Sequence, residues 1–246
     1  MPPPPPSPSP FQIRDASTNT NPSDTPFIIS TFDSSLTYLS SIGSIDQWGL
    51  TPFSERGDFP TETRKEIQQS ETNQRTGSNI SNGLRIFIVE REYTHTHPEA
   101  GDTPPHLRLT ADGKRVLPVG FAYVRENWVP GYVASQTQLA VPVPVPVPVP
   151  GTEGEGEGEG FLYLEVIVTD TRVGELRRGA GAALIRGIRE YGRERGMRAL
   201  WVDSWAGNGR KLVRYYEEQG FEAVGDWSHE RANKSPWLGT LMRMEI

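Results

Sequence analysis

Residues 176–185, LRRGAGAALI, place two glycines at the start of an amphipathic helix, downstream of the most apolar strand-like run of the chain. Gly179 and Gly181 let the backbone come close to a ligand. The first turn of a helix also has N–H groups without an internal partner, and the helix dipole favours an anion there. The segment therefore predicts a site for a phosphate-bearing ligand, held mainly by the backbone amides of residues 177–182.

Composition limits what kind of protein surrounds this loop. The 246 residues include 22 prolines and 25 glycines, so we expect only part of the chain to pack into a core. The formal net charge of −6 speaks against a general nucleic-acid binder. No apolar run is long enough to cross a membrane, and the absence of cysteine excludes disulfides and cysteine-ligated zinc. The N-terminus lacks a secretory pattern, so we expect a cytoplasmic protein, with a nuclear location left open.

Two segments of biased composition divide the chain. Residues 1–25 are mostly Pro, Ser, Thr, Asn and Asp, which predicts a disordered tail. A second segment, at about 127–160, contains a Val-Pro repeat at 141–150 and a Gly-Glu repeat at 151–160, typical of a stiff rod followed by a flexible tether. We interpret it as a low-complexity loop insertion within one folded domain, residues 26–246, in preference to a partner-binding element.

The hydrophobic pattern of residues 26–246 alternates between strands and helices. A short strand is expected at 27–31, followed by a helix that begins at Asp33. Further strands are expected at 84–89, 116–124, 161–168, 199–203, 221–224 and 238–244, and further helices at about 60–74, 179–195 and 209–219. The pattern predicts a mixed α/β fold, with a central mixed sheet of about six to seven strands flanked by about four helices.

Three kinds of phosphate site use a glycine loop before a helix. A P-loop needs Lys and then Ser or Thr after its second glycine, whereas Gly181 is followed by Ala-Ala-Leu, which excludes a nucleoside triphosphatase. A Rossmann dinucleotide site is disfavoured because Leu184 stands at the third glycine position and ten residues separate Val168 from Gly179. The third kind is a coenzyme A site.

Two consecutive stretches carry a resemblance to a known family. They are FLYLEVIVTDTRVGELRRGAGAALIRGIREYGRERG, residues 161–196, and ALWVDSWAGNGRKLVRYYEEQGF, residues 199–221. In their order of strand, glycine loop, helix, strand and helix ending in YYEEQGF, they resemble the acetyl-CoA-binding half of a GNAT-type N-acetyltransferase. The resemblance implies a GNAT-like fold and transfer of an acetyl group from acetyl-CoA to a primary amine. We expect a small-molecule acceptor, because no acidic or aromatic groove for a peptide is evident in the sequence. Leu176 departs from the Arg or Gln that begins the family's loop pattern, and Arg177 or Arg178 would supply the missing charge.

The resemblance also assigns contacts with the cofactor. The backbone of Val166, Ile167 and Val168 is expected to bind the pantetheine arm, because a bulge in this strand would free its N–H groups. The loop residues expected to bind the pyrophosphate are Arg177, Arg178, Gly179, Ala180, Gly181 and Ala182. Asn208, one residue out of the family's usual register, is expected to contact the cofactor arm.

The same resemblance points to the catalytic groups. Tyr216 stands at the family's tyrosine position, five residues before the end of the motif, and is the expected general acid for the coenzyme A sulfur. Tyr215 points about 100° away around the helix, so both rings cannot face the thiol, and a core position for Tyr216 is the alternative. Glu165 is the expected general base, with an outward surface position as its alternative. Asp203 and Ser204 are further candidates for the base.

Three histidines, His95, His97 and His106, lie in a Pro-rich polar loop without any other ligand pattern, so we interpret them as solvated and expect no metal.

The expected partners are acetyl-CoA and an amine acceptor, without nucleic acid or membrane, and the choice between monomer and homodimer stays open. A non-catalytic acyl-CoA-binding or scaffolding protein is the second hypothesis, because of Leu176 and the open assignment of the base.

Overall fold

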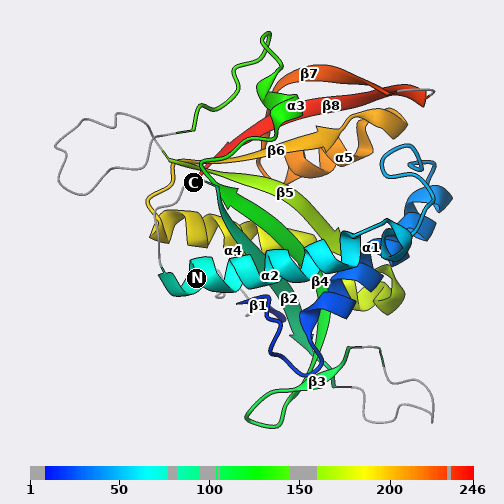
Figure 1. The fold of residues 1–246 in the computed structure, drawn as a ribbon, viewed down its shortest axis with the longest axis vertical. Helices are drawn as coiled ribbons and strands as arrows, with labels where there is room; N and C mark the ends of the chain where they lie inside the picture. Colours follow the sequence, from blue (N-terminus) through cyan, green and yellow to red (C-terminus); the bar gives the residue numbers. More distant parts are fainter. Residues whose placement is uncertain (1–8, 77–81, 95–103, 105, 145–159, 232–233) are drawn as a thin grey trace, which may run out of the picture.

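The structure, a computed structural model, describes residues 9–76, 82–94, 104, 106–144, 160–231 and 234–246. Within these residues eight strands form one mixed sheet, with α1 and α2 on one face and α4 and α5 on the other (Figure 1). The strands are β1 (Phe11–Asp15), β2 (Gly83–Glu92), β3 (Arg108–Leu109), β4 (Arg115–Glu126), β5 (Phe161–Thr169), β6 (Ala199–Trp205), β7 (Glu222–Arg231) and β8 (Lys234–Glu245). The helices are α1 (Asp24–Ser41), α2 (Phe59–Thr76), α3 (Gly131–Ala134), α4 (Ala180–Glu194) and α5 (Gly207–Glu218), with short 3-10 helices η1 (Phe53–Glu55) and η2 (Thr171–Arg177). The prediction of a mixed α/β fold is confirmed.

The strand order is β1-β2-β4-β5-β6-β8-β7, and β3 pairs with β4 at its side. Every neighbouring pair is antiparallel except β5 and β6, which run parallel and are joined through α4. The sheet therefore has one parallel step near its centre, and the helix that follows the glycine loop makes the crossover.

Helix α1 occupies the place of the strand predicted at 27–31, so that prediction is wrong. The helix begins after Ser23, whose Oγ accepts a hydrogen bond from the N–H of Thr25 at 3.3 Å. Its buried positions recur every three to four residues: Phe27, Ile28, Thr31, Phe32, Ser35 and Leu36. Asp33 lies inside the helix and not at its start, and its Oδ1 accepts a hydrogen bond from the N–H of Phe53 at 2.6 Å.

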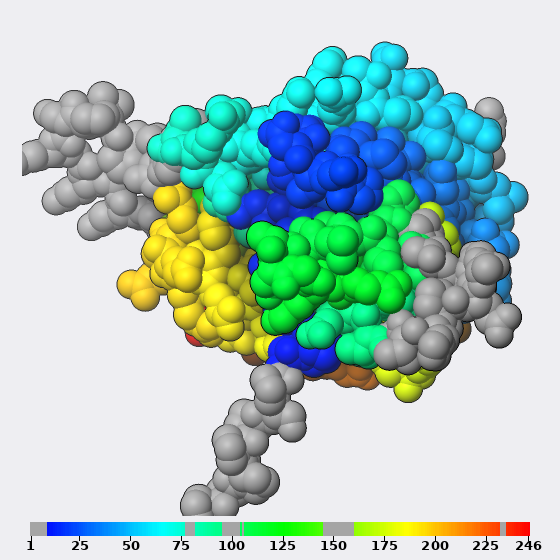
Figure 2. Space-filling view, turned by 90° about the horizontal axis from the view of Figure 1, so that it is seen from below, coloured from blue at the N-terminus to red at the C-terminus, as the bar shows by residue number. Residues whose placement is uncertain are grey.

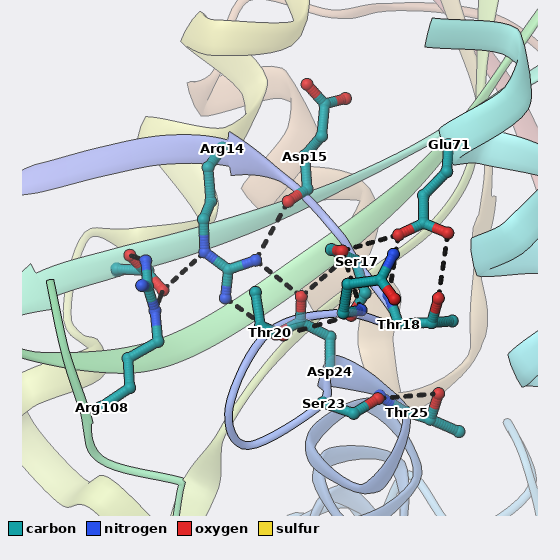
Figure 3. Close-up of polar contacts among 12 residues, drawn as sticks. Arg14, Asp15, Ser17, Thr18, Thr20, Ser23, Asp24, Thr25, Glu71 and Arg108 are labelled. Atoms are coloured by element: carbon teal, nitrogen blue, oxygen red, sulfur yellow. Dashed lines mark hydrogen bonds and ion pairs between the residues drawn. The ribbon is translucent and has the colours of Figure 1, made fainter. Parts of the chain in front are cut away.

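The prediction that residues 1–25 form a disordered tail is also wrong from residue 11 onward, because β1 pairs with β2 at one edge of the sheet. Arg14 on β1 binds both carboxylate oxygens of Asp24 on α1, at 2.6 and 2.8 Å, and donates to Glu90 on β2 at 2.7 Å (Figure 3). Glu90 also binds Arg108 on β3 at 2.6 Å. Asp24 and Glu90 are both buried, so this network joins β1, α1, β2 and β3 inside the protein. Residues 1–8 lie outside the described residues.

The space-filling view agrees with this arrangement. The first described residues, in blue, lie against the cyan, green and yellow parts of the chain that hold α2, the β3–β4 region and α4 (Figure 2). Ile13 on β1 lies so close to Gly187 on α4 that a Cβ on this glycine would come within 3.0 Å of it. The N-terminal strand is therefore part of the folded core.

The first part of the predicted insertion is also folded. Residues 127–142 pass over the sheet, include α3, and bury Val133 completely against a cluster with Tyr163, Trp201 and Trp227. At the base of this segment the N–H of Asn127 donates to the carbonyl of Phe161 at 2.9 Å, and the N–H of Phe161 donates to Asn127 Oδ1 at 3.0 Å. Residues 145–159, with most of the two repeats, lie outside the described residues.

Candidate active site

Strands β5 and β6 separate at the centre of the sheet. They pair only from Phe161–Leu164 to Ala199–Val202. Beyond this point β5 continues along β4, with a bulge at Glu165, whereas β6 continues along β8. Residues 165–169 therefore have no strand partner on the β6 side, and backbone N–H groups there are free to bind a ligand. Val166, Ile167 and Val168 all lie in this part, as the sequence predicted, while their contact with a cofactor stays a prediction.

The glycine loop forms the start of α4. Gly179 adopts the left-handed conformation, with φ of 85°, directly before Ala180, and no side chain caps the helix. The N–H groups of the first turn are therefore open toward the cavity described below. Ala180 is an exception among the predicted loop contacts, because its side chain is fully buried in the core and only its backbone is available to a ligand.

The two arginines of the loop differ in their contacts. Arg177 donates to Thr169 Oγ1 at 3.0 Å, and its guanidinium lies 5.0 Å from the ring centre of Tyr38. Arg178 is 80% exposed and pairs with Glu175 at 2.8 Å. Leu176 packs against the core, which explains why this position is apolar here. Positive charge at the loop therefore comes from Arg177 and Arg178.

Tyr215 and Tyr216 both reach the cavity from α5, from different sides. Tyr216 is 4% exposed and packs edge-on against Phe221, with 5.3 Å between ring centres. Burial raises the pKa of its hydroxyl above the ordinary value, and the charges of Tyr215 and Asp203 act in the same direction, so this hydroxyl stays protonated. The hydroxyl of Tyr215 lies directly over Gly181 instead. The two rings therefore face different parts of the site, as the helix geometry predicted.

The contact between Tyr215 and Gly181 gives a testable prediction. We expect Gly181→Ala to lower the affinity for acetyl-CoA by about tenfold, because the new methyl group would overlap the Tyr215 hydroxyl and push this ring into the loop. In a Tyr215→Phe background the nearest ring atom, Cζ, lies 3.5 Å from the Cβ position, which is ordinary contact. Titration calorimetry of the four proteins should therefore show that Tyr215→Phe rescues Gly181→Ala, whereas additive effects of the two changes would contradict this geometry.

Two carboxylates stand where the strands separate. Glu165 accepts a hydrogen bond from Arg125 Nε at 2.6 Å, so its charge is compensated. Asp203, on β6, accepts hydrogen bonds from the hydroxyls of Tyr163 and Tyr132, the latter at 3.2 Å. Burial raises the pKa of Asp203, while its two tyrosine donors oppose this shift. Ser204 is completely buried in β6 and is not among the residues that line the cavity, so the structure does not bring it to the site.

Glu66 on α2 belongs to the same charge cluster, 3.7 Å from Arg125. Burial raises its pKa to about 7, the charge of Glu165 adds to this shift, and Arg125 opposes it. The folded protein therefore holds a proton on Glu66 that the unfolded chain loses near pH 4.5.

This shift predicts a pH-dependent difference in stability between the wild type and Glu66→Gln. Because the folded-state pKa is raised, the contribution of the protonated Glu66 is complete below about pH 4.5 and is lost as the pH rises through about 7. Glutamine mimics the protonated form, so we expect the melting temperature of Glu66→Gln to rise relative to wild type between these pH values and then to level off. Thermal melts at several pH values would show this, with Glu190→Gln, at an exposed position of α4, as the control. A difference that does not vary with pH would contradict the assignment.

Asn208 connects the site to the end of α1. Its Nδ2 donates to the carbonyl of Ile42 at 2.6 Å and to Ser44 Oγ at 2.8 Å, and its backbone is left-handed, with φ of 47°. Both amide hydrogens are thus used within the protein, and Oδ1 is the atom left for a cofactor. The predicted contact with the cofactor arm stays a prediction, now limited to this oxygen.

One cavity of about 750 Å³ joins these groups through the split sheet. On the α4 and α5 side it is lined by Arg177, Arg178, Gly179, Gly181, Ala182 and Tyr215. In the split it is lined by residues 164–169, Val202, Asp203 and Tyr216. On the opposite side the walls are aromatic, with Tyr38, Trp48, Tyr132 and Trp237. A ligand can therefore reach the same point of the sheet from both faces.

The histidines do not contribute to this cavity. His106 lies 3.1 Å from Ser30 Oγ and packs edge-on against Phe27, while His95 and His97 lie outside the described residues. In the part of the chain that the structure describes, no group of three or more histidine or acidic side chains is arranged to hold a metal ion. The helices among the described residues are all too short or too polar to cross a membrane.

Comparison with known proteins finds similar solved structures, several of which are named acetyltransferases. No protein-family model and no curated protein matches the chain. Solved structures do match over 96% of it. Ribosomal-protein-alanine N-acetyltransferase from Brucella melitensis matches with 99% of that chain covered, 16% identity and a TM-score of 0.45. YncA from Salmonella typhimurium, solved with its cofactor acetyl-CoA, matches with 94% of that chain covered, 12% identity and a TM-score of 0.48. PaiA N-acetyltransferase from Thermoplasma acidophilum, solved with coenzyme A, matches with 99% of its chain covered, 11% identity and a TM-score of 0.48.

The mixed α/β sheet agrees with the fold class that the sequence predicted. The bulge of β5 at Glu165 is the irregularity that the resemblance implied for this strand. This fold does not by itself define the acceptor, which depends on the residues around the cavity.

Sequence reasoning missed the aromatic side of the cavity. Tyr132 lies in the segment that was interpreted as insertion, Trp48 lies in the connection after α1, and Trp237 lies on β8, just before the strand predicted at 238–244. The cluster of aromatic and Gly-Pro residues in WVPGYV, residues 128–133, was the available signal, because such large apolar side chains are unusual in a solvated loop.

Proposed function

We propose that this chain is an acetyltransferase that moves the acetyl group of acetyl-CoA to a primary amine of a small molecule. The observation that supports this most is the single cavity through the split sheet. At one end it has open helix N–H groups and arginines, and at the other it has carboxylates. An anionic cofactor and a basic amine can thus approach one another from opposite faces.

The cofactor binds in the α4 half of the cavity. The pyrophosphate accepts hydrogen bonds from the first-turn N–H groups at Gly181 and Ala182, with Arg177 and Arg178 adding charge. The pantetheine arm runs along Val166–Val168, whose backbone lacks a partner on the β6 side. The thioester then lies at the point where β5 and β6 separate.

The chemistry needs three groups at that point. The amine nitrogen forms a bond to the thioester carbon, the carbon–sulfur bond breaks, and the amine proton passes to Glu165 or, alternatively, to Asp203. The departing thiolate takes a proton from the Tyr216 hydroxyl, and backbone N–H groups of β5 stabilise the oxyanion. The two carboxylates and the buried tyrosine all line this part of the cavity.

The proposal is tested in two steps. Titration calorimetry with acetyl-CoA should show saturable binding to the folded protein. Incubation with acetyl-CoA and a mixture of primary amines should then release the free thiol of coenzyme A, faster than with acetyl-CoA alone. Absence of binding would remove the proposed function, and binding without thiol release would favour the non-catalytic acyl-CoA-binding alternative.

A further inference from the structure

The charged side chains that line the cavity are separated by sign. The cations are Arg177 and Arg178 on the loop and Lys211 on α5, one helical turn from Tyr215, which lies over Gly181. The carboxylates are Glu165 and Asp203 in the split. Arg177 also reaches toward α1, where its guanidinium lies 5.0 Å from the ring centre of Tyr38. Among the described residues, none of the three lining cations forms an ion pair with Glu165 or Asp203. The split itself therefore carries the negative charge of the cavity.

The two carboxylates are compensated to different degrees. Arg125 forms an ion pair with Glu165. The side-chain donors to Asp203 among the described residues are the hydroxyls of Tyr163 and Tyr132, and none of the ion pairs found among these residues includes Asp203. A partly buried carboxylate held by neutral donors gains from a cation placed beside it. Asp203 is thus the group in this cavity that is best suited to meet an ammonium.

Aromatic rings border the same space. Tyr132 packs on Trp227 with 5.5 Å between ring centres, and Trp227 packs on Trp237 at 5.1 Å, so this wall is held by stacked rings. Trp48 faces the cavity from the connection after α1 and packs edge-on against Phe32 at 5.7 Å. Such rings bind flat apolar groups and attract cations to their faces.

We infer that the acceptor is an arylalkylamine, an amine on a short chain that carries an aromatic ring and has no carboxylate beside the nitrogen. This inference rests on the proposed function and adds the chemical class of the acceptor. The ammonium would form an ion pair with Asp203. The aromatic ring of the acceptor would pack between Trp48 and the stacked rings that include Tyr132 and Trp237. The carboxylate of an α-amino acid would face Glu165 and Asp203, so amino acids should be poor acceptors.

Matched pairs of acceptors test this directly on the wild-type protein. With saturating acetyl-CoA, thiol release is measured for 2-phenylethylamine against phenylalanine and for tryptamine against tryptophan. Phenylalanine amide, in which an uncharged amide replaces the carboxylate, is the third member of the first set. We expect kcat/KM for each amine to exceed that of its amino acid by at least about tenfold, with the amide closer to the amine. If a protein that binds acetyl-CoA acetylates the amino acids equally well, or acetylates only non-aromatic amines, the inference is wrong. If acetyl-CoA does not bind, the proposed function itself fails.

A binding experiment separates recognition from turnover. We expect Asp203→Asn to weaken the binding of 2-phenylethylamine to the coenzyme A-saturated protein by at least about tenfold, because the amide keeps the shape but not the charge. Acetyl-CoA affinity should stay unchanged and serves as the check of folding. Asp226→Asn makes the same change on β7, at a residue outside the cavity lining, and should leave amine binding unchanged. Equal amine affinity in wild type and Asp203→Asn would overturn the assignment of Asp203.

Discussion

Replacing Tyr216 by phenylalanine is expected to lower kcat by about 10²- to 10⁴-fold while acetyl-CoA affinity stays near that of the wild type. The change removes only a hydroxyl, and the ring keeps its place against Phe221 in the core. In the described part of the chain that hydroxyl donates no hydrogen bond to another residue, so its loss should not disturb the fold. Burial raises the pKa of Tyr216, which keeps its proton available for the thiolate.

Single-turnover and steady-state thiol release would measure this effect, and calorimetry would measure the affinity. Tyr215→Phe is the matched control on the neighbouring position, since its hydroxyl faces Gly181 rather than the split of the sheet. We expect it to change cofactor affinity more than kcat. An unchanged kcat in Tyr216→Phe would remove this residue from the acid role and leave it as a core residue.

The second large effect concerns stability and the N-terminal strand. Asp24→Ala is expected to lower the free energy of unfolding by about 3–5 kcal/mol, because it leaves the Arg14 guanidinium largely buried with half of its carboxylate partners removed. Asp24 also accepts a hydrogen bond from the N–H of Ser17 at 2.8 Å, which anchors the turn between β1 and α1. The change therefore affects two elements at once.

Urea unfolding of the two proteins would measure this difference. Lys65→Ala removes one partner of the exposed pair Lys65–Glu62 on α2 and should change the free energy of unfolding by less than about 1 kcal/mol. If Asp24→Ala and Lys65→Ala have similar effects, the network around Arg14 does not hold the strand in place.

Loss of β1 would also remove contacts that support the glycine loop before α4. A Cβ on Gly179 would lie 3.4 Å from the Phe11 ring, and Arg91, whose guanidinium lies 5.8 Å from that ring centre, donates to the carbonyl of Leu176 at 3.3 Å. The strand that was predicted as a disordered tail thus supports the loop that was predicted to bind the cofactor.

The parts of the fold that were predicted correctly are determined by residues that lie close together in the sequence. The start of α4 was visible because Gly179 is needed where the chain turns left-handed into the helix. The positions of Tyr215 and Tyr216 followed from helix geometry alone. The strands at the centre of the sheet were visible as apolar runs because they are covered on both faces.

The parts that were missed depend on distant contacts. Strand β1 is short and polar, and it is stable through Arg14 and its partners far along the chain rather than through an apolar pattern. The run Phe27–Thr31 is rich in residues that favour strands, yet Ser23 and the spacing of apolar residues through Leu36 make it helical. Tyr132 enters the site because its segment folds back over β6, which no local pattern indicates.

The pair of hydrogen bonds between Asn127 and Phe161 has a consequence for how this protein can vary. It closes the ends of the chain between β4 and β5 at one point, where the N–H of Arg198 also donates to the carbonyl of Gly160 at 2.8 Å. The free energy of closing a loop grows only slowly with its length. Repeat units can thus be gained or lost beyond Val141 during evolution, or replaced by a reporter sequence in the laboratory, without shifting the register of β4 and β5.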